Sequence, residues 1–509
     1  MAGYWNRIGV GSLWNICCLA HLQGHRRAAN NRLVELSKFS HHEKGLGALQ
    51  PLNPKHHICE KNLMRNEVPV LLYVRPWNLE QMEHLARGVW GQSAHLTLTS
   101  EHKSVDTSGL VAVFESEYKH YDGEDLQYLS ETESADIILR CRLLRSLPSS
   151  QTMRLLRSME SAVDRVLSEN KPAAMLSVTV DSYVIDVFAH LCEQRGIPFI
   201  GLVPSFLKNH FRISTRGERV VSRKVSTEDI DRARENLIVD DYRPDFLVQS
   251  EREMRSQMRR LWFRNLPKPL WFYLRRVVTG EHLNYHFWSS QKTSSQYWSP
   301  WPRSFRGVSG SELAQLAENP DLPLIYVPLQ MSPEATIDYW SSDTRWIDYE
   351  VFLLDLIRRY RGRWRFIVKE HPNLLGFRSP DFYKRLRAEP NCTLVAPKIP
   401  SNDLVTLCDG LLVCTGTAGF EALLRGKPVI SESAPYYAPH RAFLPFEALN
   451  GKLPQQDINA KAQNRLLEYS LEGMLPGRFV NNGTWDRNNA QHRAWSDEMA
   501  ESLKRYLAN

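Results

Sequence analysis

Apolar runs of strand length alternate with helical spacing along the chain from residue 68 onwards. In the first half these runs are short and bounded by turn residues: Val68–Val74, Ala94–Thr99, Ala174–Val180 and Ile197–Leu202. Segments with a helical period separate them, over 78–89, 135–169 and 183–195. Because strands that alternate with helices form parallel sheets covered on both faces, this half predicts a doubly wound α/β domain.

A second series of the same kind begins near residue 324 and predicts a second α/β domain. Its strand-like runs are Leu324–Gln330, Arg365–Glu370, Cys392–Ala396, Gly410–Cys414 and Pro428–Ile430. An amphipathic helix over 490–507 closes the chain. Residues 1–65 show no clear period, and residues 206–302 change to basic, aromatic-rich helical segments. We therefore expect an extension at 1–65, one α/β domain at 66–302 with a helical insertion over about 206–302, and a second at 303–509.

Composition narrows the class of protein. Hydrophobic residues make up 42% of the chain and charged residues 24%, which excludes an intrinsically disordered protein. Eight scattered cysteines have no zinc-like spacing and are typical of reduced thiols in the cytoplasm. We expect no metal and no cofactor. No apolar run reaches the roughly 18 residues of a membrane span, so the sequence predicts a cytoplasmic protein.

The segment from residue 414 to 429 combines the end of a buried strand, a glycine-containing turn and the start of a helix. Free N–H groups at a helix N-terminus bind anions. Thr415 and Thr417 add hydroxyl donors, and Gly416 lets a phosphate approach the backbone. Glu421 lies on the same helical face as Thr417, where it reaches a ribose hydroxyl. The alternative is that Thr417 only caps the helix and Glu421 complements its dipole.

The sequence Lys369-Glu370-His371-Pro372 follows another strand-like run. Pro372 ends the strand and fixes the turn. Lys369 and His371 are therefore expected at the carboxyl edge of the sheet, where ligands of open α/β folds bind. There an imidazole donates to a phosphate and a lysine neutralises one. The alternative is a solvated strand end, with a histidine whose hydrogen-bonding groups already have partners and bind no ligand.

Three polar positions elsewhere are candidates for contact with sugars or for proton transfer. Gln330 and Glu334 follow the strand-like run that ends near Pro328, and they are placed for sugar hydroxyls or acid–base chemistry. Asp181 follows a buried strand of the first domain and is a candidate base for an acceptor hydroxyl. The alternatives are turn and capping roles, with Asp181 as the N-cap of the next helix.

Three of these motifs together resemble the capsule polysaccharide biosynthesis family, which includes β-Kdo transferases. They are PLQMSPEAT at Pro328–Thr336, KEHP at Lys369–Pro372 and TGTAGFEALLRGKPVI at Thr415–Ile430. The resemblance covers about a quarter of the chain, with weaker support from Phe382, Tyr383, Pro397 and Ser401. It implies a GT-B fold, with two Rossmann-like domains facing a central cleft. The second domain of such a fold holds the nucleotide sugar and the first faces the acceptor.

The resemblance also implies the chemistry, a glycosyltransferase that uses CMP-Kdo or a related donor and a glycan or glycolipid acceptor. The HP pair then places His371 on the nucleotide phosphate, where it donates a hydrogen bond and carries charge as the phosphate leaves. Two alternatives stay open. One is a UDP-sugar-dependent transferase or epimerase of the same fold, and the other is a non-catalytic partner in capsule export or assembly.

The basic, aromatic segment from Met254 to Val278 suggests peripheral contact with the inner membrane. Trp271 and Phe272 are its central aromatic residues. The alternative is that these aromatics pack against the first domain while the arginines face water. A nucleic-acid partner is not expected, because the net charge of the whole chain is only +7.

Overall fold

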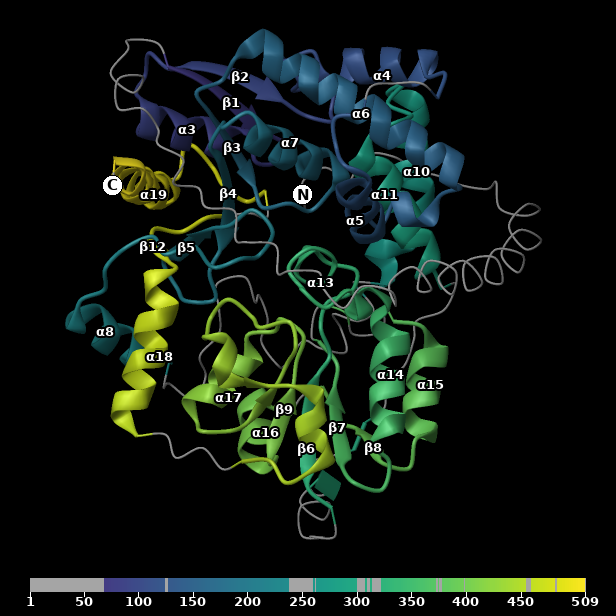
Figure 1. The fold of residues 1–509 in the computed structure, drawn as a ribbon, viewed down its shortest axis with the longest axis vertical. Coiled ribbons are helices and arrows are strands. Elements are labelled where there is room, and N and C mark those ends of the chain that lie inside the picture. The colour runs from purple at the N-terminus through teal and green to yellow at the C-terminus, as the bar shows by residue number, and fades with distance from the viewer. Residues whose placement is uncertain are drawn as a thin grey trace. The chain divides into compact units, whose positions relative to one another are not determined.

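The computed structural model contains two α/β lobes, each built on a six-stranded sheet (Figure 1). It describes residues 68–123, 127–237, 260, 262–299, 307–308, 312–313, 322–371, 374, 378–397, 399–454, 459–480 and 483–508. The expected extension at 1–65 lies outside these residues. No helix in the described ranges is long and apolar enough to cross a membrane.

The sheet of the first lobe has the strand order β12-β5-β4-β3-β1-β2. Strands β1 to β4 are parallel, whereas β5 and β12 are antiparallel to their neighbours. The strands are β1 Pro69–Tyr73, β2 His95–Thr99, β3 Ala174–Val178, β4 Phe199–Pro204, β5 His210–Ile213 and β12 Leu475–Pro476. The helices are α3 Leu79–Trp90, α4 Leu110–His120, α5 Glu131–Arg140, η1 Leu144–Ser146, α6 Ser149–Asn170, α7 Tyr183–Gln194, α10 Lys268–Val278, α11 Tyr285–Gln296 and α19 Ala490–Ala508.

The sheet of the second lobe is parallel throughout, in the order β11-β10-β9-β6-β7-β8. The strands are β6 Leu324–Pro328, β7 Arg365–Lys369, β8 Cys392–Leu394, β9 Gly410–Leu412, β10 Val429–Ile430 and β11 Phe443–Leu444. The helices are α8 Thr227–Leu237, α13 Ala335–Asp338, η3 Thr344–Asp348, α14 Tyr349–Arg359, α15 Pro380–Ala388, α16 Ser401–Leu407, α17 Ala418–Leu424, η5 His440–Ala442, η6 Phe446–Asn450 and α18 Ala460–Glu472. Two doubly wound α/β lobes are thus confirmed.

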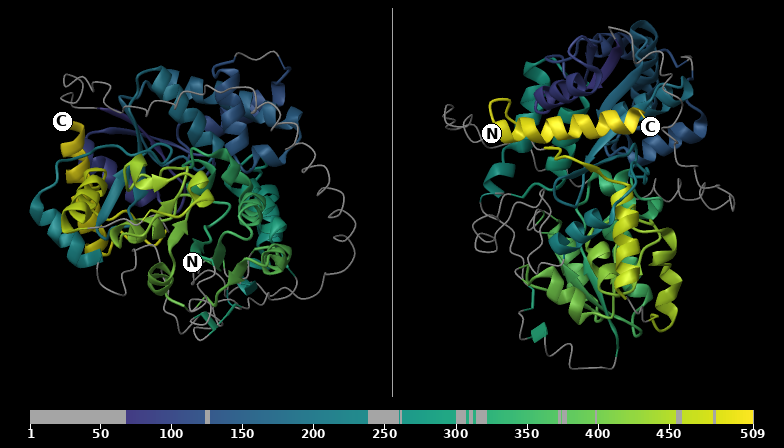
Figure 2. Two further views of the ribbon diagram at one scale, coloured as in Figure 1. Left: turned by 60° about the horizontal axis from the view of Figure 1, so that its bottom comes forward. Right: turned by 90° about the vertical axis from the view of Figure 1, so that its left-hand side faces the viewer.

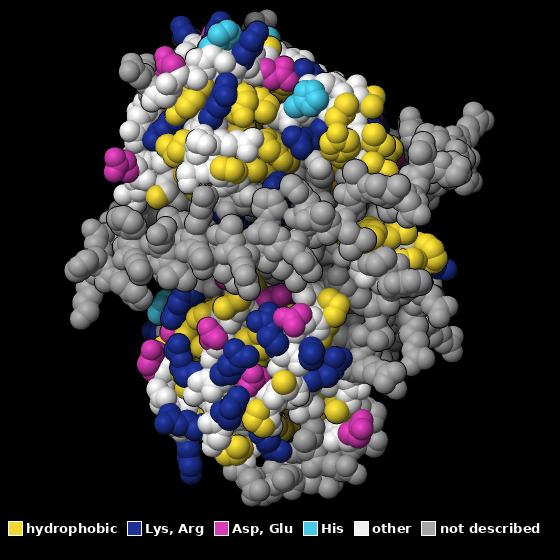
Figure 3. Space-filling model, turned by 90° about the vertical axis from the view of Figure 1, so that its right-hand side faces the viewer, with side chains coloured by type: hydrophobic (Ala, Val, Ile, Leu, Met, Phe, Trp, Pro, Cys, Tyr) yellow, Lys and Arg dark blue, Asp and Glu magenta, His cyan; other side chains and the backbone are white. Residues whose placement is uncertain are grey.

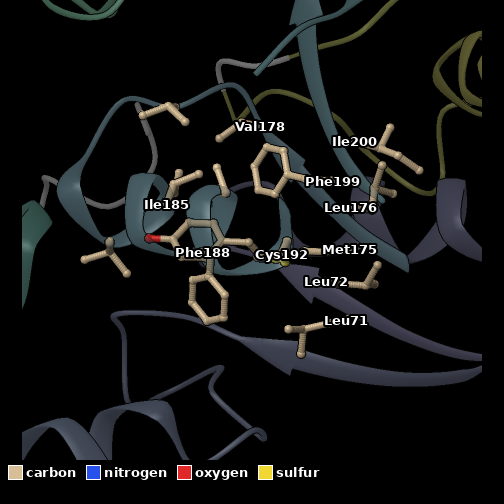
Figure 4. Close-up of a cluster of buried hydrophobic side chains, with 14 of the residues drawn as sticks. Leu71, Leu72, Met175, Leu176, Val178, Ile185, Phe188, Cys192, Phe199 and Ile200 are labelled. Carbon is tan, nitrogen blue, oxygen red and sulfur yellow. Dashed lines mark hydrogen bonds between the residues drawn. The ribbon is translucent and has the colours of Figure 1, made fainter. Parts of the chain in front are cut away.

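Successive side chains along each strand point to opposite faces of the sheet, so register partners on neighbouring strands pack on the same face. In the first lobe, Leu72, Leu176 and Ile200 are register partners on β1, β3 and β4, and they line up in Figure 4. Phe188 and Cys192 of α7 join the same core cluster. Burying each large apolar side chain contributes about 1.5–3 kcal/mol to the free energy of unfolding. These buried apolar residues therefore dominate the stability of the lobe.

The end of the chain returns to the first lobe, which differs from the expected second domain at 303–509. Strand β12 pairs antiparallel with β5. Met499, Ala500 and Leu503 of α19 belong to the first-lobe core, and both views in Figure 2 draw α19 beside that lobe. Sequence alone could not assign this helix, because an amphipathic face does not say which surface it covers.

The expected helical insertion over about 206–302 also differs from the structure. Its first part contains β5, which extends the first sheet, and Phe211 and Ile213 are buried in that core. Helix α8 instead contributes Ile230, Ala233 and Leu237 to a core cluster of the second lobe. Within the described residues of this range, α10 and α11 match the aromatic helical character that the sequence predicted. Strand β5 is only four residues long, too short to give a clear period of two.

Candidate functional site

The three motifs of the second lobe follow three adjacent strands. Gln330 comes after β6, His371 after β7 and Thr415 after β9, and β6 lies between the other two. Because all three strands are parallel, the motifs meet at one carboxyl edge, as the sequence predicted. Neighbouring strands lie about 4.8 Å apart, so β7 and β9 are separated by roughly 10 Å. Gln330 is therefore the central residue of the edge.

Gln330 packs directly on the turn after β9. Its side-chain oxygen lies 3.4 Å from both the backbone nitrogen and the hydroxyl of Thr415. A Cβ at Gly416 would fall 2.2 Å from the Gln330 amide nitrogen. A side chain at this position would therefore displace the Gln330 amide, so packing favours a glycine here. The expectation that Gly416 lets a phosphate approach the backbone stays a prediction. The Thr415 hydroxyl also hydrogen-bonds within the protein, because it donates to Thr336 O at 3.0 Å.

The start of α17 retains donors that face no protein acceptor. Thr417 is the N-cap, but its side chain makes no capping hydrogen bond, so the simple capping role does not hold. Within the described part of the chain, the N–H groups of Gly416, Thr417 and Ala418 have no hydrogen-bond acceptor. Such groups attract anions, although a helix of seven residues adds only a small dipole.

One face of β7 carries Lys369 toward the helices α16 and α17. The Lys369 ammonium donates to Ser401 Oγ at 3.2 Å, and Tyr326 of β6 donates to the same oxygen at 3.2 Å. Glu421 is half-buried, and burial raises its pKa, while Arg425 and Lys369 act in the opposite direction. Lys369 and Glu421 therefore lie near each other, beside the donors of the turn.

His371 lies close to two cations. Burial, together with the positive charges of Arg378 and Lys369, lowers the pKa of His371 to about 4. The imidazole is therefore neutral at pH 7 in the absence of ligand. An anion at this edge would raise that pKa, because it would offset the two positive charges. The adjoining Pro372 lies outside the described residues.

The opposite face of β7 buries Glu370, a residue of the KEHP motif that the sequence analysis did not select. Its carboxylate pairs with Arg378 Nε at 2.8 Å and accepts hydrogen bonds from the Tyr383 hydroxyl and, at 2.6 Å, from the His371 N–H. Arg378 also donates to Gln330 O. Glu370 and Arg378 thus fix the backbone on which both Gln330 and His371 stand. This gives Tyr383, one of the weaker supports of the resemblance, a physical role.

Replacing Glu370 with glutamine should lower the free energy of unfolding by about 3–5 kcal/mol, because Arg378 would remain buried without its counter-charge. Urea unfolding followed by circular dichroism measures the change. The matched control is Glu169→Gln, which breaks an exposed pair with Arg165 and should leave the transition in place. An unchanged midpoint for Glu370→Gln would show that the buried pair does not hold this edge.

Glu334 stands where the two lobes meet. It precedes α13, and its carboxylate accepts from the Thr336 hydroxyl at 2.7 Å. Burial raises the pKa of Glu334, against the lowering effects of Thr336 and of Arg142 from the first lobe. Thr336 O in turn accepts from Thr415. A half-buried carboxyl of raised pKa, linked in this way to the β9 turn, is suited to proton transfer.

Asp181 forms an ion pair, whereas the sequence suggested a base for an acceptor hydroxyl. Both of its oxygens accept from the Arg75 guanidinium, at 2.7 and 2.8 Å. Burial alone would raise the pKa of Asp181, but Arg75 and then Arg142 hold it below its ordinary value. A carboxylate so paired is a weak base, which argues against general-base catalysis. The capping alternative is also wrong, because Ser182 is the N-cap of α7.

Asp181 belongs to a buried charge network at the carboxyl edge of the first sheet, which sequence analysis missed. Arg75 follows β1 and Glu101 follows β2, and they form an ion pair at 2.9 Å. Tyr73 donates to Glu101. His102, 3% exposed, stands beside this network, and burial lowers its pKa to about 4. The available signal was that Arg75, Glu101 and Asp181 each come just after a strand.

The network makes stability depend on pH through His102. The folded-state pKa of His102, about 4, is below the ordinary value of 6.5, so between these values the unfolded chain binds more protons. Stability should therefore fall as the pH drops from 6.5 to 4. From pH 7 to 5, His102 should cost about 2 kcal/mol. Unfolding of parent and His102→Gln at both pH values tests this; equal losses in the two proteins would contradict it.

Among the described residues, no cluster of His, Cys, Asp and Glu could hold a metal ion. The side chains and N–H groups named above define the chemistry that the edge offers. They comprise a neutral imidazole, an ammonium, two half-buried carboxyl groups and unpaired backbone donors. Such a set suits an anionic ligand that also carries hydroxyl groups. The carboxyl groups would accept hydrogen bonds from the hydroxyls, and the imidazole, ammonium and N–H groups would donate to the anion.

Comparison with solved structures finds remote similarities. The β-Kdo 2,7 transferase KpsC of Thermosulfurimonas dismutans is 14% identical, over 86% of this chain and 98% of that chain, with a TM-score of 0.34. A UDP-GlcNAc 2-epimerase from Methanocaldococcus jannaschii, solved with UDP-GlcNAc and UDP, is 13% identical, over 79% and 98%, with a TM-score of 0.22. These similarities are too remote to transfer an activity. A search of curated proteins finds no match.

The family comparison is more specific. The model described as capsule polysaccharide biosynthesis protein matches residues 302–440. This range contains β6, β7 and β9 with the three motifs that follow them. It agrees with the segment in which the sequence resemblance was seen. Residues 302–440 are therefore similar to the capsule polysaccharide biosynthesis family.

Proposed function

We propose that the protein is a glycosyltransferase that moves a sugar from a nucleotide donor onto a surface polysaccharide or a lipid-linked acceptor. The observation that carries the proposal is the edge at which β6, β7 and β9 end. Lys369, neutral His371 and the unpaired N–H groups before α17 gather there. These groups attract a phosphate, and the edge lies in the capsule biosynthesis domain.

In this proposal, the donor phosphate lies between His371 and the turn at Thr417. Lys369 supplies charge from the neighbouring face, and Glu421 accepts from a ribose hydroxyl. As the bond to the sugar breaks, negative charge builds up on the phosphate, and His371 stabilises it by donating a hydrogen bond. We propose CMP-linked Kdo or a related acidic sugar as the donor, on the basis of the family resemblance.

Glu334 is the proposed proton acceptor for the attacking hydroxyl of the acceptor. Its carboxyl has a raised pKa and stands next to Arg142 of the first lobe. Arg142 also pairs with Asp338 at 3.1 Å, and Arg145 pairs with the same carboxylate at 2.9 Å. These ion pairs hold the first lobe against α13, and so hold Glu334 in place. Asp181 is left as a positioning partner of Arg75.

A panel of donors tests the proposal. CMP-Kdo, UDP-GlcNAc and a GDP-sugar are each added to the pure protein, and both melting temperature and product are followed. A ligand at a hundred times its Kd adds about 2.7 kcal/mol to the stability. We expect stabilisation by the CMP donor, and sugar transfer with an acceptor. Transfer from UDP-GlcNAc alone would favour the UDP alternative, and an epimerised donor would indicate an epimerase. No product with any donor would favour the non-catalytic partner and overturn the proposal.

A further inference from the structure

Exposed apolar side chains are concentrated on α10 and just before it. Nine large hydrophobic side chains are exposed in the described part of the chain, and seven of them lie between Phe263 and Val278. No residue of α10 is buried. Val278 is 80% exposed. The face of the molecule that carries α10 is drawn in Figure 3, where apolar side chains lie among cationic ones.

The exposed residues form one continuous surface of the helix. At 100° per residue, they cover an arc of about 160°. In order around the arc they are Tyr273, Val277, Leu270, Leu274, Val278 and Trp271. The other side of α10 is fixed against α11, since the Phe272 ring lies 5.8 Å from His286 and the Arg276 guanidinium 4.4 Å from the Trp288 ring. Phe272 and Arg276 therefore pack within the protein, whereas Leu270, Leu274 and Val278 of the arc are exposed.

Cations on α10 and just before it border this arc. Residues 262–280 contain four cations and no Asp or Glu. Arg276 donates a hydrogen bond to Gln291 of α11. Arg264 and Arg275 are exposed, and Lys268 is half-buried. Helical spacing puts Lys268 and Arg275 next to Trp271, and the Arg275 guanidinium lies 4.9 Å from the Trp271 ring. An apolar arc with a cationic rim matches acyl chains beneath anionic headgroups.

We infer that α10 docks on an anionic lipid bilayer, with Leu270, Leu274 and Val278 inserted at the boundary between headgroups and acyl chains. Leu274 and Val278 offer nothing to a phosphate backbone, which disfavours a nucleic acid as the occupant. For the proposed function, docking would place the acceptor in the membrane. That extension rests on the proposed function, but the docking itself does not.

Flotation with vesicles tests the inference without any activity assay. The full chain is mixed with vesicles of phosphatidylcholine alone or of phosphatidylcholine with phosphatidylglycerol. We expect binding to the mixed vesicles, weakened by salt. Leu274→Ser with Val278→Ser should weaken it about tenfold, and Lys268→Gln with Arg275→Gln about fivefold for each charge removed. The control is Val351→Ser, which removes an exposed valine of α14 and should bind like the parent.

Three results would overturn the inference. The first is a parent protein that does not bind the mixed vesicles, and the second is binding of both double variants at the level of the parent. Concentration-dependent dimers that the serine variant loses, without vesicle binding, would assign the arc to a second copy of the chain. If the donor panel gives no product but flotation succeeds, the proposed function fails and the docking stands. If soluble acceptors react normally but flotation fails, only the docking is lost.

Discussion

Replacing His371 with alanine should lower the turnover of sugar transfer by about 10²–10³-fold, the usual cost of losing one donor that stabilises transition-state charge. The melting temperature should stay close to that of the parent. The His371 backbone N–H donates to Glu370 and its carbonyl accepts from Leu374, and an alanine keeps both hydrogen bonds. Steady-state kinetics with the matched donor measures the loss, and thermal unfolding measures stability.

The control for this variant is His95→Ala, which removes an exposed histidine of β2 in the first lobe. It should keep full turnover. The pKa of His371 adds an independent readout. In the free protein it is about 4, and a bound phosphate should raise it, so donor binding should take up protons and strengthen as the pH falls toward 4. Full activity in His371→Ala, or binding without proton uptake in the parent, would contradict the assignment.

Replacing Glu334 with glutamine should lower turnover by about 10²–10⁴-fold, because the amide cannot accept the proton of the acceptor hydroxyl. The variant keeps the volume of the side chain and an oxygen that accepts from Thr336, so the fold should persist. Burial raises the pKa of Glu334. The acidic limb of the parent's pH–rate profile should therefore lie above that of an ordinary carboxyl, and it should disappear in the variant.

Asp181→Asn is the informative comparison, because Asp181 was the other candidate base. Its carboxylate is paired with Arg75, so the substitution should reduce stability first and leave the acidic limb of the pH profile where it was. If Asp181→Asn loses the acidic limb and Glu334→Gln keeps it, Asp181 is the general base and Glu334 is not.

The sequence predicted those parts of the fold and site that depend on local periodicity. The apolar runs of β6 and β7 were sufficient to find both strands and to place Gln330 and His371 at their ends. That their carboxyl ends would share an edge followed from the parallel arrangement. The strand order was not predictable, so it was unknown that Gln330 would lie between His371 and Thr415.

Other features depend on contacts between segments that are distant in sequence. Arg75 and Asp181 are 106 residues apart, and neither position alone indicates that the two would neutralise each other. The packing of Gln330 beside Gly416 was not predictable, because Gln330 follows another strand. The return of α19 to the first lobe was missed for the same reason. A helical period identifies an apolar face but not its partner.

A crystal structure of the full chain with CMP bound is the most direct test of the donor site. The account predicts that the phosphate lies at the carboxyl edge of β6, β7 and β9, within hydrogen-bonding distance of His371 and of the N–H groups at Thr417. It also predicts the ribose beside Glu421. A nucleotide bound instead at the first-lobe network around Arg75, or elsewhere in the second lobe, would contradict it.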